Sequence, residues 1–216
     1  METTAPGQVL AYGWYKRRWF RLAHLHAGAG VSSYRRNYLP GGTFYFTLVT
    51  YARRPILTTD LGRSCLREAM VETRNQFPFQ LFAICLLPDH LHAIWVMSRG
   101  DADFSIRWRR IKQLFTEKWL HAGGSEAQVT DAQSKEGRRG IWQPRFWEHT
   151  VSDEADLERC VDYTHWNPRK HGLVRRVQDW PHSSFHRFVN EGQYERNWGG
   201  TAPGTIAGND DWGEPT

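Results

Sequence analysis

Two histidines separated by one residue, His90 and His92, are the first side chains whose types and spacing could support chemistry. Their neighbours are apolar and predict a strand. Alternate residues of a strand share a face, so both imidazoles point the same way while Leu91 points into the core. Two neutral imidazoles on one face can hold a metal ion. A purely structural pair is the alternative, although histidines at the start of a buried strand then need polar partners.

A tyrosine and an asparagine four residues apart, Tyr163 and Asn167, form a second candidate group. On a helix such residues lie one above the other. If this helix crosses the face that carries the histidines, a phenol, an amide and two imidazoles meet. A phenol is a poor nucleophile at neutral pH, so attack by Tyr163 would need a metal or a base. The alternative is a core tyrosine and an asparagine that ends the helix before Pro168.

The chain has 216 residues, enough for one domain with tails, and its 40% hydrophobic and 24% charged residues exclude a wholly disordered or fibrous protein. The longest apolar run, 81–87, is far shorter than the roughly 20 residues that span a bilayer. The N-terminus lacks a secretory pattern. We therefore expect a cytoplasmic protein without a membrane partner. The three dispersed cysteines predict core residues, not disulfides or a thiolate zinc site.

The basic residues are mostly arginine: 23 of 28, with a net charge of +5. Arginine binds phosphate oxygens bidentately and stacks on bases, and the interleaved aromatic rings suit single-stranded nucleic acid. Composition alone leaves open an aromatic core beneath a solvated arginine surface. The basic side chains expected to contact nucleic-acid phosphates are Lys16, Arg17, Arg18, Arg21, Arg107, Arg109, Arg110 and Lys112.

Hydrophobic periodicity gives the elements that must position these groups. Strands are expected at 43–51, 79–87, 91–97 and 142–151, the last starting near residue 145 because of Pro144. Helices are expected at 60–75, with Asp60 as N-cap, and at 103–121, 154–167 and 180–190. The polar segment 122–140 predicts a mobile loop.

The order β-α-β-β-α-β predicts an α+β fold of the ferredoxin-like, split β-α-β kind. Its antiparallel sheet would carry helices on one face and leave the other available for ligands, with a helix towards the C-terminus carrying Tyr163. We expect a flexible basic arm at 1–33, one domain at 34–198 and a disordered tail at 199–216.

Several segments, in order from about residue 34 to 198, resemble the signatures of the REP-associated tyrosine transposases, domesticated relatives of the single-tyrosine HUH transposases. They are GGTFYFT (41–47), PDHLHAIW (88–95), DADFS (101–105) with RW (107–108), IWQPRFWEH (141–149), DYTHWNPRKHGL (162–173), WPHSSF (180–185) and GQY (192–194). Trp166 and Arg169 depart from the Tyr and Val often found in relatives, which puts in doubt only what stacks nearby.

The resemblance implies a metal-dependent endonuclease and strand transferase. His90, His92 and Asn167 would bind Mg²⁺ or Mn²⁺, and Tyr163 would attack DNA to form a 5′-phosphotyrosine. Glu148 and His149 could assist there or simply bond at a strand end. The implied partner is a single-stranded REP or BIME-type hairpin, bound by a monomer or homodimer. A relaxase-like nickase and a non-catalytic single-strand-binding module remain the alternatives.

Overall fold

The structure is a computed structural model that describes residues 38–206 and 212–213. The predicted arm contacts of Lys16, Arg17, Arg18 and Arg21 therefore lie outside the described residues. Within the part of the chain that is described, no helix is long and apolar enough to cross a membrane.

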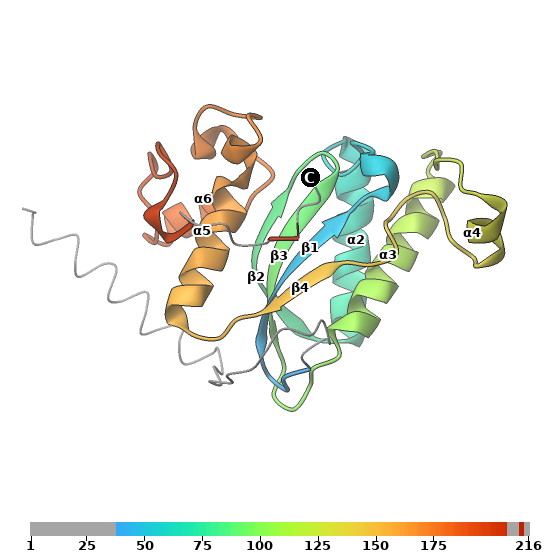
Figure 1. Ribbon diagram of the computed structural model, residues 1–216, viewed down its shortest axis with the longest axis horizontal. Coiled ribbons are helices and arrows are strands. Elements are labelled where there is room, and N and C mark those ends of the chain that lie inside the picture. Colours follow the sequence, from blue (N-terminus) through green and yellow to red (C-terminus); the bar gives the residue numbers. More distant parts are fainter. Residues whose placement is uncertain (1–37, 207–211, 214–216) are drawn as a thin grey trace, which may run out of the picture.

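Four strands form one antiparallel sheet (Figure 1). They are β1 (Thr43–Val49), β2 (Phe79–Leu86), β3 (His90–Met97) and β4 (Trp147–Thr150), in the spatial order β2-β3-β1-β4. This confirms the predicted α+β fold with its antiparallel sheet. β4 starts two residues after the expected start near residue 145. Trp142 is limited to an isolated bridge with Thr50.

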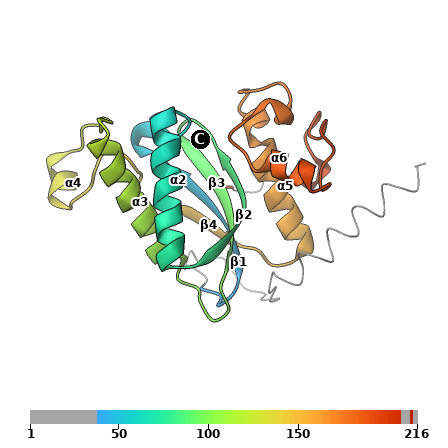
Figure 2. The same ribbon diagram turned by 180° about the vertical axis from the view of Figure 1, so that it is seen from behind.

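Helices α2 (Asp60–Gln76) and α3 (Phe104–His121) cover the first face of the sheet. Figure 2 shows α2 lying along the sheet with α3 beside it. Their apolar stripes bury Leu91 and its alternate neighbours on β3, as the period-2 pattern predicts. The N-cap of α2 is Thr59 and not Asp60, because the Thr59 hydroxyl accepts the Gly62 N–H at 3.0 Å.

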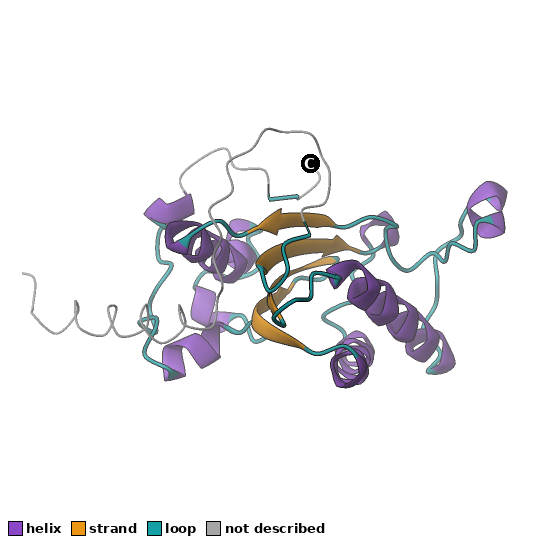
Figure 3. Cartoon of the chain, turned by 90° about the horizontal axis from the view of Figure 1, so that it is seen from below, coloured by secondary structure: helices purple, strands orange, loops and turns teal. Residues whose placement is uncertain are grey.

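Helices α5 (Glu154–Lys170) and α6 (Phe185–Asn190) cover the second face, so helices lie on both sides of the sheet (Figure 3). The expectation of a face open to ligands is wrong. α5 continues through Pro168 for three residues beyond its predicted end and stops at Gly172, which adopts φ +67°. α6 is shorter than predicted, since residues 182–184 pair with the edge of β2 instead of forming a helical turn. A 3₁₀ turn, η2 (Val177–Asp179), precedes this segment.

Two segments expected to lack structure contain ordered contacts. The loop 122–140 carries a short helix, α4 (Asp131–Lys135), and the Tyr51 hydroxyl of the 3₁₀ turn η1 (Tyr51–Arg53) donates to Gln133 at 3.1 Å. In the expected tail, η3 (Gly204–Ile206) brings the Thr205 hydroxyl to the buried Asp162 carboxylate, and Trp212 is buried. These residues of the expected tail therefore contact the core in the structure. All three cysteines are free and buried, as predicted.

Candidate metal and nucleophile site

The two histidines face α5, and the structure brings them together as predicted. In the register of β1 with β3, His90 lies opposite Val49 and His92 lies opposite Thr47. Both side chains are buried, and their ring centroids are 5.1 Å apart. The HxH pair therefore forms one cluster on a single face of the sheet.

His90 is oriented by a carboxylate. Its Nδ1 donates to Asp89 Oδ1 at 2.7 Å, and the other oxygen of Asp89 accepts from Arg53 at 2.8 Å. Burial alone would raise the pKa of Asp89, but the hydrogen bonds from His90 and Arg53 outweigh it and lower that pKa to about 2. The ionised carboxylate holds the His90 proton on Nδ1, so Nε2 carries the lone pair. That nitrogen is buried and has no partner among the described residues.

His92 is held by two hydroxyl groups of β1. Its Nδ1 lies 2.6 Å from Tyr45 Oη and 3.0 Å from Thr47 Oγ1. The Thr47 hydroxyl donates its own proton to the Trp212 carbonyl at 2.7 Å, which leaves its oxygen to accept from His92. The Tyr45 hydroxyl can either donate to this nitrogen or accept from it, so a proton on Nδ1, with the lone pair on Nε2, is one of two tautomers that the network allows. Both histidines are hydrogen-bonded through Nδ1, the arrangement found in metal-binding imidazoles that use Nε2.

Tyr163 projects from α5 towards the histidines and is only 2% exposed. Its ring centroid lies 5.5 Å from that of His92, and its ring stacks on Trp212. Its hydroxyl accepts a hydrogen bond from Lys170 Nζ at 2.5 Å. A cation at this oxygen stabilises the phenolate form, which is the attacking form of a phenol.

Asn167 and His171 lie on the same stripe of α5 as Tyr163, one and two turns further on. Asn167 is fully buried, and the His171 ring centroid is 5.1 Å from that of His90. An amide oxygen with two neutral imidazoles leaves the charge of a divalent ion uncancelled, so this donor set suits an ion that also binds an anionic phosphate. The donors present are therefore compatible with Mg²⁺ or Mn²⁺.

Glu148 and His149 do not join this cluster. Glu148 lies opposite Phe46 on β1, so its side chain is on the face covered by α2 and α3. His149 faces α5 but donates to Asp156 at 2.7 Å. Asp156 is about 16 Å along the helix from Asn167. The predicted auxiliary role at the histidines is therefore unsupported for either residue.

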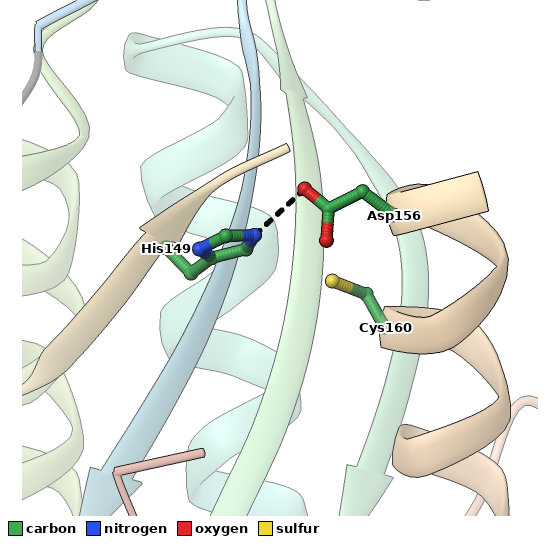
Figure 4. A group of neighbouring side chains, drawn as sticks. All are labelled: His149, Asp156 and Cys160. Carbon is green, nitrogen blue, oxygen red and sulfur yellow. Dashed lines mark hydrogen bonds and ion pairs between the residues drawn. The ribbon is translucent and has the colours of Figure 1, made fainter. Parts of the chain in front are cut away.

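His149, Asp156 and Cys160 form a separate group whose potential ligand atoms lie within 4.8 Å of one another (Figure 4). Asp156 also accepts from the Ser152 N–H at 2.8 Å and from Arg159 at 3.0 Å. Burial would raise the pKa of Asp156, but these bonds, with that of His149, outweigh it and lower the pKa. Because the carboxylate charge already has cationic and N–H partners, we assign the group to fixing the start of α5.

Arg107 does not reach solvent, so its predicted contact with DNA phosphate is wrong. It is 2% exposed and forms an ion pair with Asp101. It also donates to the carbonyls of Phe77 and Pro78 at 3.2 and 3.0 Å. The guanidinium therefore joins the chain before β2 to the chain before α3.

The other predicted cations of α3 lie across the sheet from Tyr163. Arg109 is exposed, Arg110 pairs with Glu72 at 3.2 Å, and Lys112 donates to a backbone carbonyl at 2.8 Å. The sheet therefore separates these three cations from the histidine cluster.

Five residues at the site escaped the sequence analysis: Tyr45, Thr47, Lys170, His171 and Trp212. Lys170 and His171 follow Tyr163 by seven and eight residues, which is about two helical turns. Helical spacing could therefore have placed both on the stripe of Tyr163. Tyr45 and Thr47 alternate along β1, so the strand period could have placed them on one face. Trp212 belongs to no local pattern.

Comparison with known proteins places the chain in a family. No protein-family model matches it. It is 42% identical over 179 residues to the REP-associated tyrosine transposase of Escherichia coli (strain K12), covering 82% of this chain and 97% of that protein. A Haemophilus influenzae protein of the same family name is 39% identical over 178 residues, covering 82% and 99%.

A solved structure agrees with these sequence matches. It is that of a REP-associated tyrosine transposase bound to a REP hairpin, with a TM-score of 0.68 and 38% identity. The match covers 86% of this chain and 99% of that chain. The chain therefore belongs to the REP-associated tyrosine transposases.

Proposed function

We propose that this protein cleaves and transfers single-stranded DNA at REP-type hairpins, using Tyr163 as the nucleophile. The observation that carries the proposal is the convergence of the Tyr163 phenol, with Lys170 at its oxygen, on His90 and His92. The relative bound to a REP hairpin supports the class of substrate.

His90 and His92, through Nε2, and Asn167, through its amide oxygen, would hold Mg²⁺ or Mn²⁺. The bound ion would supply positive charge to a scissile phosphate. The Lys170 ammonium stabilises the Tyr163 phenolate, and Tyr163 Oη attacks phosphorus. The bond from phosphorus to the 3′ oxygen breaks, leaving a 5′-phosphotyrosine and, after protonation, a 3′-hydroxyl. Because the new ester replaces the old one, a 3′-hydroxyl can reverse the step and join strands without ATP.

The decisive experiment tests covalent attachment. Labelled hairpin DNA with unpaired flanks is incubated with the protein and Mg²⁺ or Mn²⁺ and resolved on denaturing gels. Tyr163→Phe should abolish the adduct and leave hairpin binding nearly unchanged, because it removes only the attacking oxygen. Tyr38→Phe, at a tyrosine whose side chain is 49% exposed, is the matched control. Cleavage by Tyr163→Phe at the wild-type rate would refute the assignment.

The metal ligands are tested by binding as well as by cleavage. His90→Ala and His92→Ala should each abolish cleavage and weaken Mn²⁺ binding, since each removes one donor. Unchanged Mn²⁺ titrations for both variants would show that the histidines are structural.

One observation favours the second candidate, a DNA-binding module without cleavage: the ring of Trp212 covers Tyr163. The adduct assay separates the two candidates.

A nickase would form the adduct but would not transfer the attached DNA to an added strand with a free 3′-hydroxyl. Adding such an acceptor strand therefore distinguishes nicking from transfer.

A further inference from the structure

A cavity of about 480 Å³ lies between α2 and the edge strand β2, and we call it the α2 groove. Apolar side chains form its floor and arginines form its rim. The floor includes Leu66, Leu81 and Leu86, and the rim includes Arg63, Arg67 and Arg74. A guanidinium rim over an apolar floor is a combination that an unpaired nucleotide satisfies, since it has an anionic phosphate and a base with an apolar face.

The flank of α2 that faces the groove is basic over most of its length: Asp60, at the start of the helix, pairs with Arg63, and the other two acidic side chains point elsewhere. Glu68 and Glu72 face α3, where Lys118 lies 3.3 and 3.6 Å from them and Arg110 pairs with Glu72. Arg67 is exposed, and no described side chain pairs with its guanidinium. Its charge is therefore available to a phosphate.

The arginines follow the length of the groove. Arg67 lies one helical turn, about 6 Å, beyond Arg63, and Arg74 lies two further turns, about 10 Å, beyond Arg67. Val71, between the last two, is 52% exposed, which adds apolar surface beside their charges. This row can follow successive phosphates of one strand.

The groove starts at the end of the sheet that carries the histidines. The Leu57 N–H, just before α2, donates to the Pro88 carbonyl in the β2–β3 turn at 2.9 Å. Leu86 on the floor lies opposite Leu91, between His90 and His92 in the chain. Residues 182–184 pair with the outer edge of β2, and His182 also lines the groove, so a strand that leaves the histidine cluster reaches the groove by crossing this segment.

We propose that the α2 groove binds unpaired nucleotides that flank the hairpin, with their phosphates on Arg67 and Arg74 and their bases on the apolar floor. The proposal rests on the proposed function, which supplies a single-stranded substrate. A duplex is excluded from this binding mode because its bases are stacked and paired and cannot lie on the floor.

The test compares two probes bound to the full chain: a hairpin with single-stranded flanks on both sides, and the same hairpin trimmed of its flanks. Arg67→Glu and the double variant Arg67→Ala with Arg74→Ala should bind the flanked hairpin more weakly and the trimmed hairpin like wild type. Arg138→Ala, on the segment that follows α4, is the control for general loss of charge and should leave both affinities unchanged.

Salt dependence gives the size of the effect. Each lost contact with a single-strand phosphate lowers the slope of log affinity against log salt by about 0.7, so raising salt from about 50 to about 200 mM should weaken the double variant about sevenfold less than wild type. A double variant with the same slope as wild type would overturn the proposal. Equal losses of affinity for the flanked and the trimmed hairpin would also overturn it, because they would place the hairpin stem in the groove.

A photoactivatable base in the flank gives an independent measurement. Its crosslink should map to residues 67–74, and a crosslink to α3 instead would contradict the proposal. Binding and crosslinking do not require cleavage, so a wild-type protein that forms no covalent adduct would refute the proposed nuclease activity and leave these results interpretable.

Discussion

The indole of Trp212 lies flat against the ring of Tyr163, with centroids 4.3 Å apart and planes 12° apart. The same residue is tied to the sheet, because its carbonyl accepts from Thr47, which also contacts His92. Trp212 therefore covers the proposed nucleophile and is connected to a proposed metal ligand. If Tyr163 is the nucleophile, as proposed, the indole has to move away before a scissile phosphate can reach it.

We therefore expect Trp212→Ala to increase the initial rate of covalent DNA attachment, because it removes the ring that covers Tyr163. Gel quantification of the 5′-phosphotyrosine adduct at several times measures this. Trp212→Phe is the matched control and should stay close to wild type, since a phenyl ring can keep the stack. A lower rate for Trp212→Ala, with Trp212→Phe unchanged, would mean that the indole positions Tyr163 for attack.

The central part of the site could be predicted from local periodicity. Strand alternation places His90 and His92 on one face, and helical spacing places Tyr163 and Asn167 on one stripe, so each pair is defined within one element. Whether the two elements meet depends on which sheet face α5 covers. The ferredoxin-like order alone does not specify this for a helix that follows the last strand.

Predictions about charge and tails failed for a different reason. Arg107 lies in an arginine-rich, aromatic-rich segment, which is why the sequence predicts that it binds DNA. Its partners, Asp101 and the carbonyls of Phe77 and Pro78, come from other loops. Trp212 stacks on a ring 49 residues earlier in the chain. Contacts at such sequence separations leave no periodic signal, so sequence patterns assign these residues to the surface or to a tail.

Arg107→Met tests the structural role of this arginine. We expect it to lower the free energy of unfolding by about 3 kcal/mol, because it leaves Asp101 and three backbone carbonyls without their buried donor. Urea unfolding measures the change. Arg109→Met, at an exposed position on the same helix, should stay within about 0.5 kcal/mol. An Arg107→Met protein that keeps wild-type stability but binds DNA poorly would contradict the structural role and support the phosphate contact predicted from the sequence.

Asp156 should make stability fall in acid. Its folded pKa lies below the ordinary value of about 4, so between these values the unfolded chain binds a proton that the folded chain does not. Its contribution is present above about pH 4 and lost as pH falls through the folded pKa. Asp156→Asn should cost about 2 kcal/mol at pH 7 and make the loss of stability in acid shallower.

Unfolding at pH 7 and at lower pH checks the Asp156 prediction. Asp179→Asn, which removes one partner of the exposed pair with Arg176, is the control and should leave the stability and its acid dependence almost unchanged. Equal acid slopes for wild type and Asp156→Asn would show that other carboxyl groups control acid unfolding.

Lys170→Met should slow cleavage about 100-fold while hairpin affinity stays near wild type, because the ammonium stabilises the charge on the Tyr163 oxygen during attack. The deficit should shrink as pH rises, since the phenol then ionises with less help. Lys170→Arg, which keeps the positive charge, should recover much of the rate, and Lys135→Met on α4 controls for the loss of a lysine. Single-turnover rates across pH measure the effect. A deficit that is constant with pH and equal for Met and Arg would assign Lys170 to packing rather than to phenolate stabilisation.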